Sequence, residues 1–349
     1  MRRLLTAALA LVGLAWIAVP SAGLAGASAT SIPRFQHVFE IMMENTDYAD
    51  IIGNPAAPNL NSLADTYGLA TDYFGVTHPS EPNYVAAMSG DYWGIQDDNQ
   101  FYCTPALATT DTNCTGTTVP HTLDVPNLAS QLQGVGKSWR GYFQSLPPTP
   151  PPGQVIMDGP NANGPYTYKY PSSSVALYAS KHNPFVNFTS TQTELSNMVP
   201  DTQLSTDLAS GNLADFSFIV PDQCHDMHGT GGCGPLIPEG DAYVGATVSA
   251  IMSAKFWASG RNAIVITWDE DDYADSGLYG TGCCGSNPGG GQVATIVITN
   301  KGPIHVVDAT PYNHYSLLRT FEDAFGLPGL ANACRTDVTP LTPLFDPKP

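Results

Sequence analysis

The chain has few basic residues. Only 13 of its 349 residues are Lys or Arg, against 31 Asp or Glu, so its formal net charge at pH 7 is −18. A chain this acidic repels nucleic acid and anionic lipid surfaces at long range. We therefore expect no nucleic-acid partner. A phosphorylated substrate would need a locally positive site, which a bound divalent cation could supply.

Several common catalytic and metal-binding patterns are also missing. No G-x-S-x-G motif occurs, although an ordinary secreted lipase or esterase would be expected to show one. The segment GVGKS (134–138) lacks the first glycine of a phosphate-binding loop, and GTGCCGSNPGGG (280–291) lacks the ending of one, so we exclude nucleotide hydrolysis by that route. The second segment is interpreted as a flexible insertion.

The seven cysteines suit an oxidising compartment, and no paired C-x-x-C spacing favours a metal site instead. Cys103 and Cys114 are close enough in sequence to close a short loop, as are Cys224 and Cys233. We expect both pairs to form disulfides. The pairing of the remaining three cysteines stays open: Cys283, Cys284 and Cys334.

The N-terminus has the order of a secretory signal. Arg2 and Arg3 precede an apolar run from Leu4 to Val19, and small residues follow, with plausible cleavage after Ala27 or Ala29. The alternative is a single membrane anchor, but the run is short for a span of about 20 residues. No later stretch could cross a bilayer, so we expect secretion without stable membrane insertion.

The remainder of the chain contains no internal repeat and no convincing linker. The proline-rich segment 145–154 suits a surface excursion as well as a boundary. Roughly 320 residues can form one large domain. We therefore expect residues 1–29 to be a signal peptide and residues 30–349 to be a single catalytic domain, extracellular and monomeric.

The hydrophobic pattern predicts strands that alternate with helices. Strands are expected at 35–43, 216–220, 262–268 and 292–299, and helices at 58–68, 240–258 and 314–326. Strands that are apolar throughout and alternate with helices indicate a parallel sheet covered on both faces. The predicted fold class is therefore α/β, a three-layer α/β/α sandwich with a mostly parallel central sheet.

Polar side chains follow three of these strands directly. Glu44 and Asn45 follow the first strand, PDQCHDMH follows the strand at 216–220, and Asp269 and Glu270 follow the strand at 262–268. Ligands of parallel sheets gather at the carboxyl ends of the strands. Oxygen-rich groups of this kind suit a hard divalent cation, although zinc also accepts carboxylates. Each pair alone could equally be a solvated strand end or helix cap.

The segment PDQCHDMHG (221–229) adds imidazoles to carboxylates. Asp222 and Asp226 lie four residues apart, and His225 and His228 flank the second carboxylate. Such a set can bind a metal, orient a phosphate or protonate a leaving group, and Asp222 is a further candidate metal ligand. The alternative is a disulfide-tied loop with incidental histidines. His78 and His121 are weaker candidates.

The segment HPSEPNY (78–84) holds one serine between two prolines, with an asparagine three residues later. A rigid hydroxyl suits a nucleophile, because a serine beside a metal ion has a lowered pKa and a fixed position. Ser80 is therefore the candidate nucleophile. Asn83 can donate its amide hydrogens to a phosphoryl oxygen.

Six segments stand in the order seen in the phosphoesterase family: MMENTDYADIIGN, THPSEPNYVAAMSG, KHNPFVNF, PDQCHDMHG, VITWDEDD and NHYSLLRTFEDAFGLP. The chain resembles this family over roughly residues 35–330. The family contains secreted acid phosphatases and phospholipases C and is similar in fold to alkaline phosphatase. The resemblance is strongest to the secreted acid phosphatases of actinobacteria.

Carried over motif by motif, the resemblance implies site residues of three kinds. The implied metal ligands are Glu44, Asn45, Asp269 and Glu270. The implied catalytic residues are the nucleophile Ser80, Asn83 beside the phosphoryl group, and Asp226 and His228 near the leaving group. His182 and His314 match family positions that contact substrate, and His225 is a further candidate from its own loop.

Two departures from the phospholipase C pattern favour phosphomonoesters. Tyr84 and Asp271 stand where that branch usually has an arginine and a histidine. The expected protein is thus a metal-dependent acid phosphatase acting on a small phosphorylated substrate or a phosphoinositide headgroup, with calcium, magnesium, manganese or zinc as the ion. The alternatives are a phospholipase C and a non-catalytic, metal-stabilised binding protein.

Overall fold

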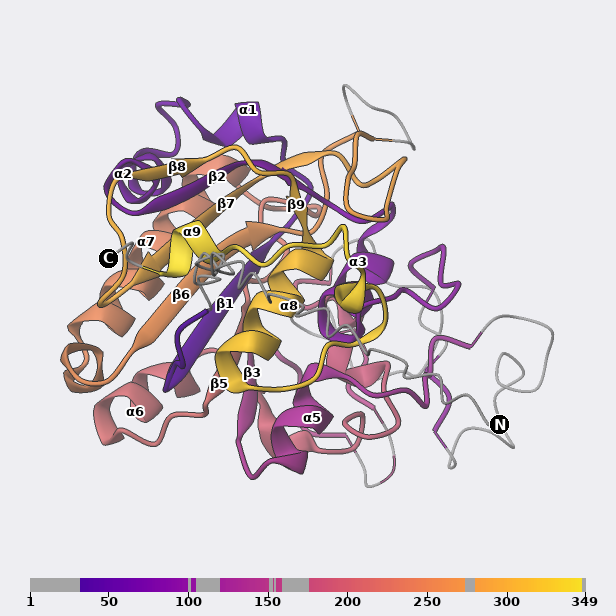
Figure 1. Ribbon diagram of the computed structural model, residues 1–349. Helices are drawn as coiled ribbons and strands as arrows, with labels where there is room; N and C mark the ends of the chain where they lie inside the picture. Colours follow the sequence, from indigo (N-terminus) through magenta and orange to yellow (C-terminus); the bar gives the residue numbers. More distant parts are fainter. Residues whose placement is uncertain are drawn as a thin grey trace, which may run out of the picture. The chain divides into compact units, whose positions relative to one another are not determined.

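One large β-sheet organises the chain (Figure 1). The computed structural model describes residues 32–99, 102–104, 120–150, 153, 155–158, 176–273 and 280–346. The predicted signal peptide at 1–29 lies outside these residues, as does Cys114 of the first predicted disulfide.

The strands of the described residues run in the spatial order β4-β3-β5-β1-β6-β7-β2-β8, and β9 pairs with β2. Their bounds are β1 His37–Met43, β2 Gly68–Phe74, β3 Trp139–Phe143, β4 Met198–Pro200, β5 Phe216–Val220, β6 Asn262–Trp268, β7 Gln292–Thr299, β8 Val306–Asp308 and β9 Tyr312–Asn313. Only β7 runs antiparallel to its neighbours β6 and β2, so the predicted, mostly parallel sheet is confirmed.

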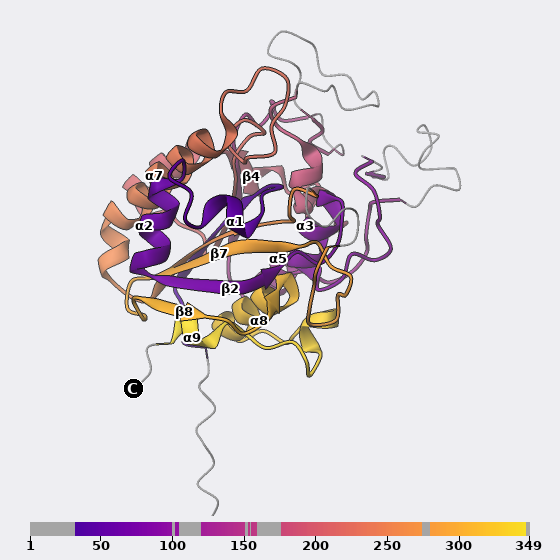
Figure 2. The same cartoon turned by 90° about the horizontal axis from the view of Figure 1, so that it is seen from above.

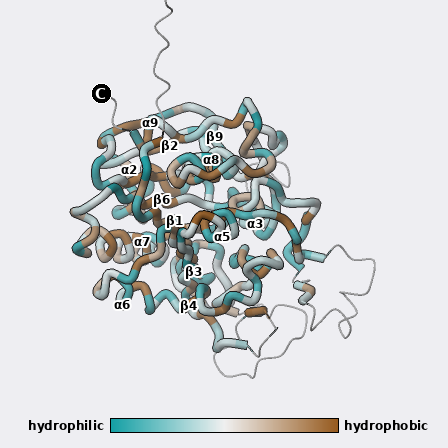
Figure 3. The backbone as a smooth tube through the Cα atoms, turned by 60° about the horizontal axis from the view of Figure 1, so that its bottom comes forward, coloured by the Kyte–Doolittle hydropathy of each residue, from teal (hydrophilic) through white to brown (hydrophobic). Residues whose placement is uncertain are grey.

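Helices cover both faces of this sheet (Figure 2). One layer contains α1 Tyr48–Ile51, α2 Pro58–Thr66 and α7 Leu236–Ser253, and α6 Gln203–Ser210 packs against α7. The other contains α3 Ser80–Ser89, α5 Leu128–Gly134, α8 His314–Phe325 and α9 Thr342–Phe345. In Figure 3 hydrophobic segments lie along the central strands, which agrees with the full burial of β5 and β6.

The predicted helix at 240–258 is the main boundary error. α7 begins at Leu236, directly after Pro235, and ends at Ser253 because Ala254 has an extended backbone (ψ 147°). The segment Lys255–Ala258 forms a separate 3₁₀ helix. By contrast, α8 ends as predicted, since Gly326 has a left-handed backbone with φ 73°.

Candidate active site

The carboxyl ends of three adjacent parallel strands bring the acidic loops together. β1 lies between β5 and β6, so Glu44 after β1 lies between the loop after β5 and the loop after β6. Backbone hydrogen bonds join the loops: Glu44 N donates to the Asp226 carbonyl at 2.8 Å, and Asp269 N donates to the Met43 carbonyl at 3.0 Å. The predicted strand-end residues are thus held by the sheet itself.

Asn45 links the first loop to the acidic pair after β6. Its backbone N–H donates to Asp269 Oδ1 at 3.1 Å, and its Nδ2 donates to Glu270 Oε1 at 3.3 Å. Its φ of 40° lies in the left-handed region, which Asn tolerates better than most residues. This conformation directs both donors toward the acidic pair.

Ser80 is the first residue of α3, a helix whose residues are all buried. Its Oγ lies 3.1 Å from Glu44 Oε2 and 3.1 Å from Glu270 Oε1, so it can donate its proton to either carboxylate. The side chain is 1% exposed. The N-terminus of a helix favours anions, because its first N–H groups lack partners within the helix. Ser80 therefore stands where a phosphoryl group would be stabilised.

Asn83 stiffens the turn that precedes Ser80. Its Oδ1 accepts from the backbone N–H groups of Val76 (2.8 Å) and Thr77 (3.0 Å). Its Nδ2 donates to the carbonyls of Thr77 (2.7 Å) and Pro79 (3.1 Å). Both amide hydrogens are taken in this arrangement, which fixes the turn before Ser80, and the contact of Asn83 with phosphate stays a prediction.

Four buried oxygen atoms at this site have no hydrogen-bond partner among the described residues: Glu44 Oε1, Asn45 Oδ1, Asp226 Oδ2 and Asp269 Oδ2. Burial, followed by neighbouring carboxylates, raises the pKa of Glu44 well above its usual range. Burial has the same effect on the pKa of Asp226 and of Asp269. Uncompensated buried carboxylates are costly. Carboxylate and amide oxygens are the ligand atoms that a hard divalent cation prefers, so these residues fit such an ion.

Two histidines adjoin the carboxylates. Glu44, His182 and His228 offer ligand atoms that lie within 4.8 Å of one another. His182 Nε2 lies 3.3 Å from Glu44 Oε1, and its Nδ1 lies 3.4 Å from Asp226 Oδ2. Burial lowers the pKa of His182 well below its usual value, which favours the neutral ring, the form that binds a metal ion. Tyr84 stacks on this ring, with centroids 5.3 Å apart.

His314 lies beneath the site. Its Nε2 bonds to the Asp269 carbonyl at 2.7 Å, and its Nδ1 lies 3.0 Å from the Tyr73 hydroxyl. Both ring nitrogens therefore have partners inside the protein. Burial lowers the pKa of His314 to about 4. The His314 ring thus holds the backbone of Asp269, and its contact with substrate stays a prediction.

The structure does not bring Asp222 into the cluster of partnerless oxygens. Its carboxylate accepts from Ser145 Oγ (2.6 Å), from Cys224 N (3.2 Å) and from the His225 ring (2.8 Å). These bonds brace a loop that the predicted Cys224–Cys233 disulfide also closes, with Cα atoms 5.0 Å apart. Asp222 and His225 thus brace this loop, and their predicted metal and substrate contacts stay predictions.

The structure also describes three cysteines near the C-terminal part of the chain: Cys283, Cys284 and Cys334. Cys283 and Cys284 form a disulfide between adjacent residues, a pairing that the cysteine spacing alone did not decide. Cys334 is unpaired and exposed.

Two residues at the site were missed or undervalued. His78 Nδ1 bonds to Glu270 Oε2, although its position before Pro79 gave only a weak signal. Lys181 bonds to Asp98 at 2.8 Å. Burial would lower the pKa of Lys181, but the carboxylates of Asp98 and Glu44 hold it above its usual value. The ammonium group therefore interacts electrostatically with the acidic site, and the position of Lys181 next to His182 in KHNPF was the available signal.

The sequence model of the phosphoesterase family matches residues 54–328. The chain belongs to this family. The match includes every predicted site residue except Glu44, which contacts Ser80, and Asn45, which contacts Glu270.

Two proteins with sequences similar to this chain are named as phosphatases. A phosphatidylinositol-3-phosphatase of Mycobacterium tuberculosis is 32% identical over 336 residues, which cover 95% of this chain and 89% of the relative. An acid phosphatase of Aspergillus fumigatus is 29% identical over 302 residues, covering 85% of this chain. The chain spans only 56% of the length of that fungal protein.

Solved structures of other proteins share the fold of this chain. A protein of the alkaline phosphatase superfamily from Vibrio parahaemolyticus matches with a TM-score of 0.50 and 10% identity, covering 85% of this chain and 68% of the other. A phosphonate monoester hydrolase from Silicibacter pomeroyi matches with a TM-score of 0.52 and 14% identity, covering 90% and 77%. The predicted alkaline-phosphatase-like fold is confirmed.

Proposed function

We propose that the chain is a secreted, metal-dependent acid phosphatase that hydrolyses phosphomonoesters through a phosphorylated Ser80. The observation that carries this proposal is the position of Ser80 Oγ, 3.1 Å from both Glu44 and Glu270 at the first turn of α3. The names of the two relatives, a phosphatidylinositol-3-phosphatase and an acid phosphatase, support phosphomonoesters as substrates.

A divalent cation would be held by Glu44, Asn45, Asp269 and Glu270. Glu44 and Glu270 contact the Ser80 hydroxyl. Glu44, Asn45 and Asp269 each have a buried oxygen without a hydrogen-bond partner among the described residues. When bound, it supplies positive charge that lowers the pKa of Ser80 and neutralises charge on the phosphoryl oxygens. Asp222 is not part of this proposed set, because its oxygens are used within its own loop.

In the first step, Ser80 Oγ attacks phosphorus and its proton passes to the carboxylate of Glu44 or Glu270. The bond between phosphorus and the substrate alcohol breaks as the Oγ–phosphorus bond forms. Either Asp226 or His228, both in the loop after β5, donates the proton that the leaving alkoxide takes up. Lys181 and the N-terminus of α3 balance the charge of the phosphoryl group.

In the second step, water attacks the phosphoserine on phosphorus. Asp226 or His228, which lost a proton to the alcohol, now accepts one from this water. The Oγ–phosphorus bond breaks, Ser80 regains its proton from the carboxylate, and inorganic phosphate leaves. Asn83 and His314 act throughout as positioning residues for Ser80 and Asp269.

The test is a hydrolysis panel with the purified chain, with and without chelator. An aryl phosphate, a phosphatidylinositol phosphate and phosphatidylcholine are compared across acidic and neutral pH. We expect release of inorganic phosphate from the first two, loss of activity with chelator, and recovery with added metal. After acid quench, peptide mass spectrometry should find the phosphoryl group on Ser80.

Ser80→Ala is the critical variant, and the exposed Ser62→Ala on α2 is its matched control. Ser80→Ala should abolish hydrolysis while metal binding and folding persist, and Ser62→Ala should behave as the wild type. Full activity in Ser80→Ala would rule out the covalent step. Cleavage of phosphatidylcholine to diacylglycerol without hydrolysis of phosphomonoesters would replace this proposal with the phospholipase C alternative.

Secretion is the remaining part of the proposal. Among the described residues, no helix is both long and apolar enough to cross a membrane. Sequencing the N-terminus of protein recovered from culture medium tests whether residues 1–29 are removed.

A further inference from the structure

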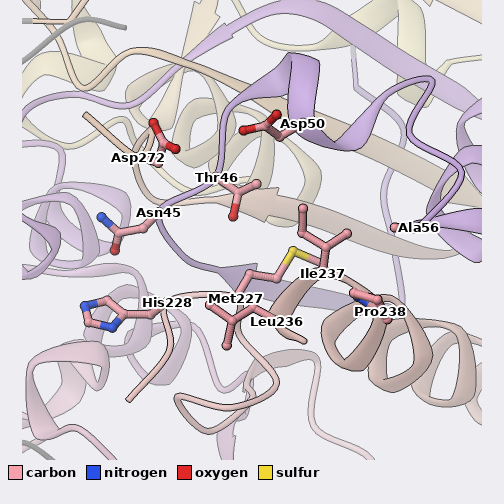
Figure 4. A pocket seen from close by; sticks show the side chains of 10 residues that line it. All are labelled: Asn45, Thr46, Asp50, Ala56, Met227, His228, Leu236, Ile237, Pro238 and Asp272. Atoms are coloured by element: carbon pink, nitrogen blue, oxygen red, sulfur yellow. The ribbon is translucent and has the colours of Figure 1, made fainter. Parts of the chain in front are cut away.

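A cavity of about 640 Å³ opens beside the proposed active site (Figure 4). Asn45 and His228 form one side of it. Both residues belong to the site described above, so a substrate that reacts at Ser80 would extend its alcohol portion into this space. We call this cavity the leaving-group pocket.

One wall of the leaving-group pocket is apolar. Met227 follows Asp226 in the loop after β5, and Leu236, Ile237 and Pro238 form the first turn of α7. Figure 4 shows these side chains on the side of the pocket away from the acidic residues. Such a wall stabilises the carbon skeleton of an alcohol by removing it from water.

The opposite wall is acidic. Asp50 of α1 and Asp272 both line the pocket, and with Asp47 they offer carboxylate oxygens that lie within 4.8 Å of one another. No Lys or Arg is found among the described residues that line it. The positive charge of Lys181 is bonded to Asp98, and neither residue lines this pocket. The charge of Lys181 thus interacts with Asp98 and Glu44, whereas carboxylates line the leaving-group pocket.

We propose that the leaving-group pocket selects phosphomonoesters of amino alcohols, in which a short apolar stem carries an ammonium group. The inference rests on the proposed function. The stem would lie against Leu236 and Ile237, and the ammonium group would face Asp50 and Asp272. Leaving groups with their own carboxylate or phosphate would be repelled by the same residues. The reaction is the one given above: the alcohol oxygen leaves phosphorus, Ser80 receives the phosphoryl group, and the amino alcohol departs with a proton.

Three substrates that differ mainly in charge provide the test. Phosphocholine carries the cation, its carbon isostere has a tert-butyl group in place of the trimethylammonium group, and phosphoglycolate carries a carboxylate. At low ionic strength we expect kcat/KM for phosphocholine to exceed that for the isostere by roughly three- to tenfold, with phosphoglycolate slowest. The preference should shrink as salt is raised, which apolar contacts alone would not produce.

The variant Asp50→Asn/Asp272→Asn should bring the ratio between phosphocholine and its isostere close to one. Asp65→Asn removes an exposed carboxylate of α2 that does not line the pocket, and it should keep the wild-type ratio. A wild-type enzyme that hydrolyses aryl phosphates without any charge preference overturns this inference and leaves the proposed function standing. A preference that survives in the double variant overturns it equally. Failure to hydrolyse any phosphomonoester overturns the proposed function itself.

Discussion

Replacing Glu40 with Gln should stabilise the protein at neutral pH. Glu40 lies in the middle of β1, between Phe218 of β5 and Val265 of β6, and is 1% exposed. Neither of its carboxyl oxygens has a hydrogen-bond partner among the described residues. Burial raises the pKa of this carboxyl from 4.5 to about 8. A carboxyl in this environment is held in its neutral form.

The sign of the effect follows from proton binding. Below pH 4.5 both the folded and the unfolded chain bind the proton, so Glu40 has no pH-dependent effect on the free energy of unfolding. As pH rises toward 8, the unfolded chain releases the proton while the folded chain retains it, so stability falls by up to about 1.4 kcal/mol per pH unit. The loss reaches roughly 3 kcal/mol at pH 7 and about 5 kcal/mol above pH 8 as an upper limit.

Gln has nearly the same shape and stays neutral at every pH. Glu40→Gln should therefore match the wild type near pH 4.5 and exceed its free energy of unfolding by roughly 3 kcal/mol at pH 7. Urea denaturation at a series of pH values, with metal held constant, measures the difference. Glu239→Gln on α7, a less buried glutamate, serves as the control. A Glu40→Gln protein that is less stable than the wild type at pH 7, or a difference that does not change with pH, would refute the reasoning.

Four further outcomes are expected. Asp226→Asn should lower kcat by roughly 10²- to 10⁴-fold and alter the limb of the pH–rate profile that reports the general acid, with metal affinity measured in parallel. Lys181→Met should weaken competitive inhibition by inorganic phosphate about tenfold, because a charge-assisted contact is lost, and unchanged inhibition would contradict its assigned place at the phosphoryl end. Asn83→Ala should destabilise the protein by about 2–4 kcal/mol in urea, because four hydrogen bonds of the turn before Ser80 are lost. Removing the Cys224–Cys233 disulfide by Cys224→Ser/Cys233→Ser should cost about 2–3 kcal/mol, and an unchanged denaturation midpoint would count against a stabilising role.

Most of the central sheet could be predicted from local sequence, because its strands are buried on both faces. The segments 216–220, 262–268 and 292–299 are strands with the predicted bounds. The strand Trp139–Phe143 and the helix Ser80–Ser89 were not predicted. Every residue of this helix is buried. Its sequence therefore lacks the apolar stripe, repeating every three to four residues, that identifies an amphipathic helix.

The sequence by itself determined which chemical groups stand at the ends of the strands. Glu44 and Asp269 follow strands whose carboxyl ends must lie at one edge of a parallel sheet, so their proximity followed from the hydrophobic pattern. The prolines around Ser80 likewise indicated a rigid hydroxyl.

Only the tertiary structure decided which of the polar groups remain available for chemistry. Asn83, Asp222 and His314 belong to the same motifs as the central carboxylates, but their polar atoms are bonded within the protein. Lys181 pairs with Asp98 and interacts electrostatically with Glu44, from a segment that carries no strand signal of its own. Sequence order determines which residues approach the sheet edge, whereas the hydrogen bonds that each side chain makes depend on distances of a few tenths of an ångström. Those distances are set by the packing of segments far apart in the chain.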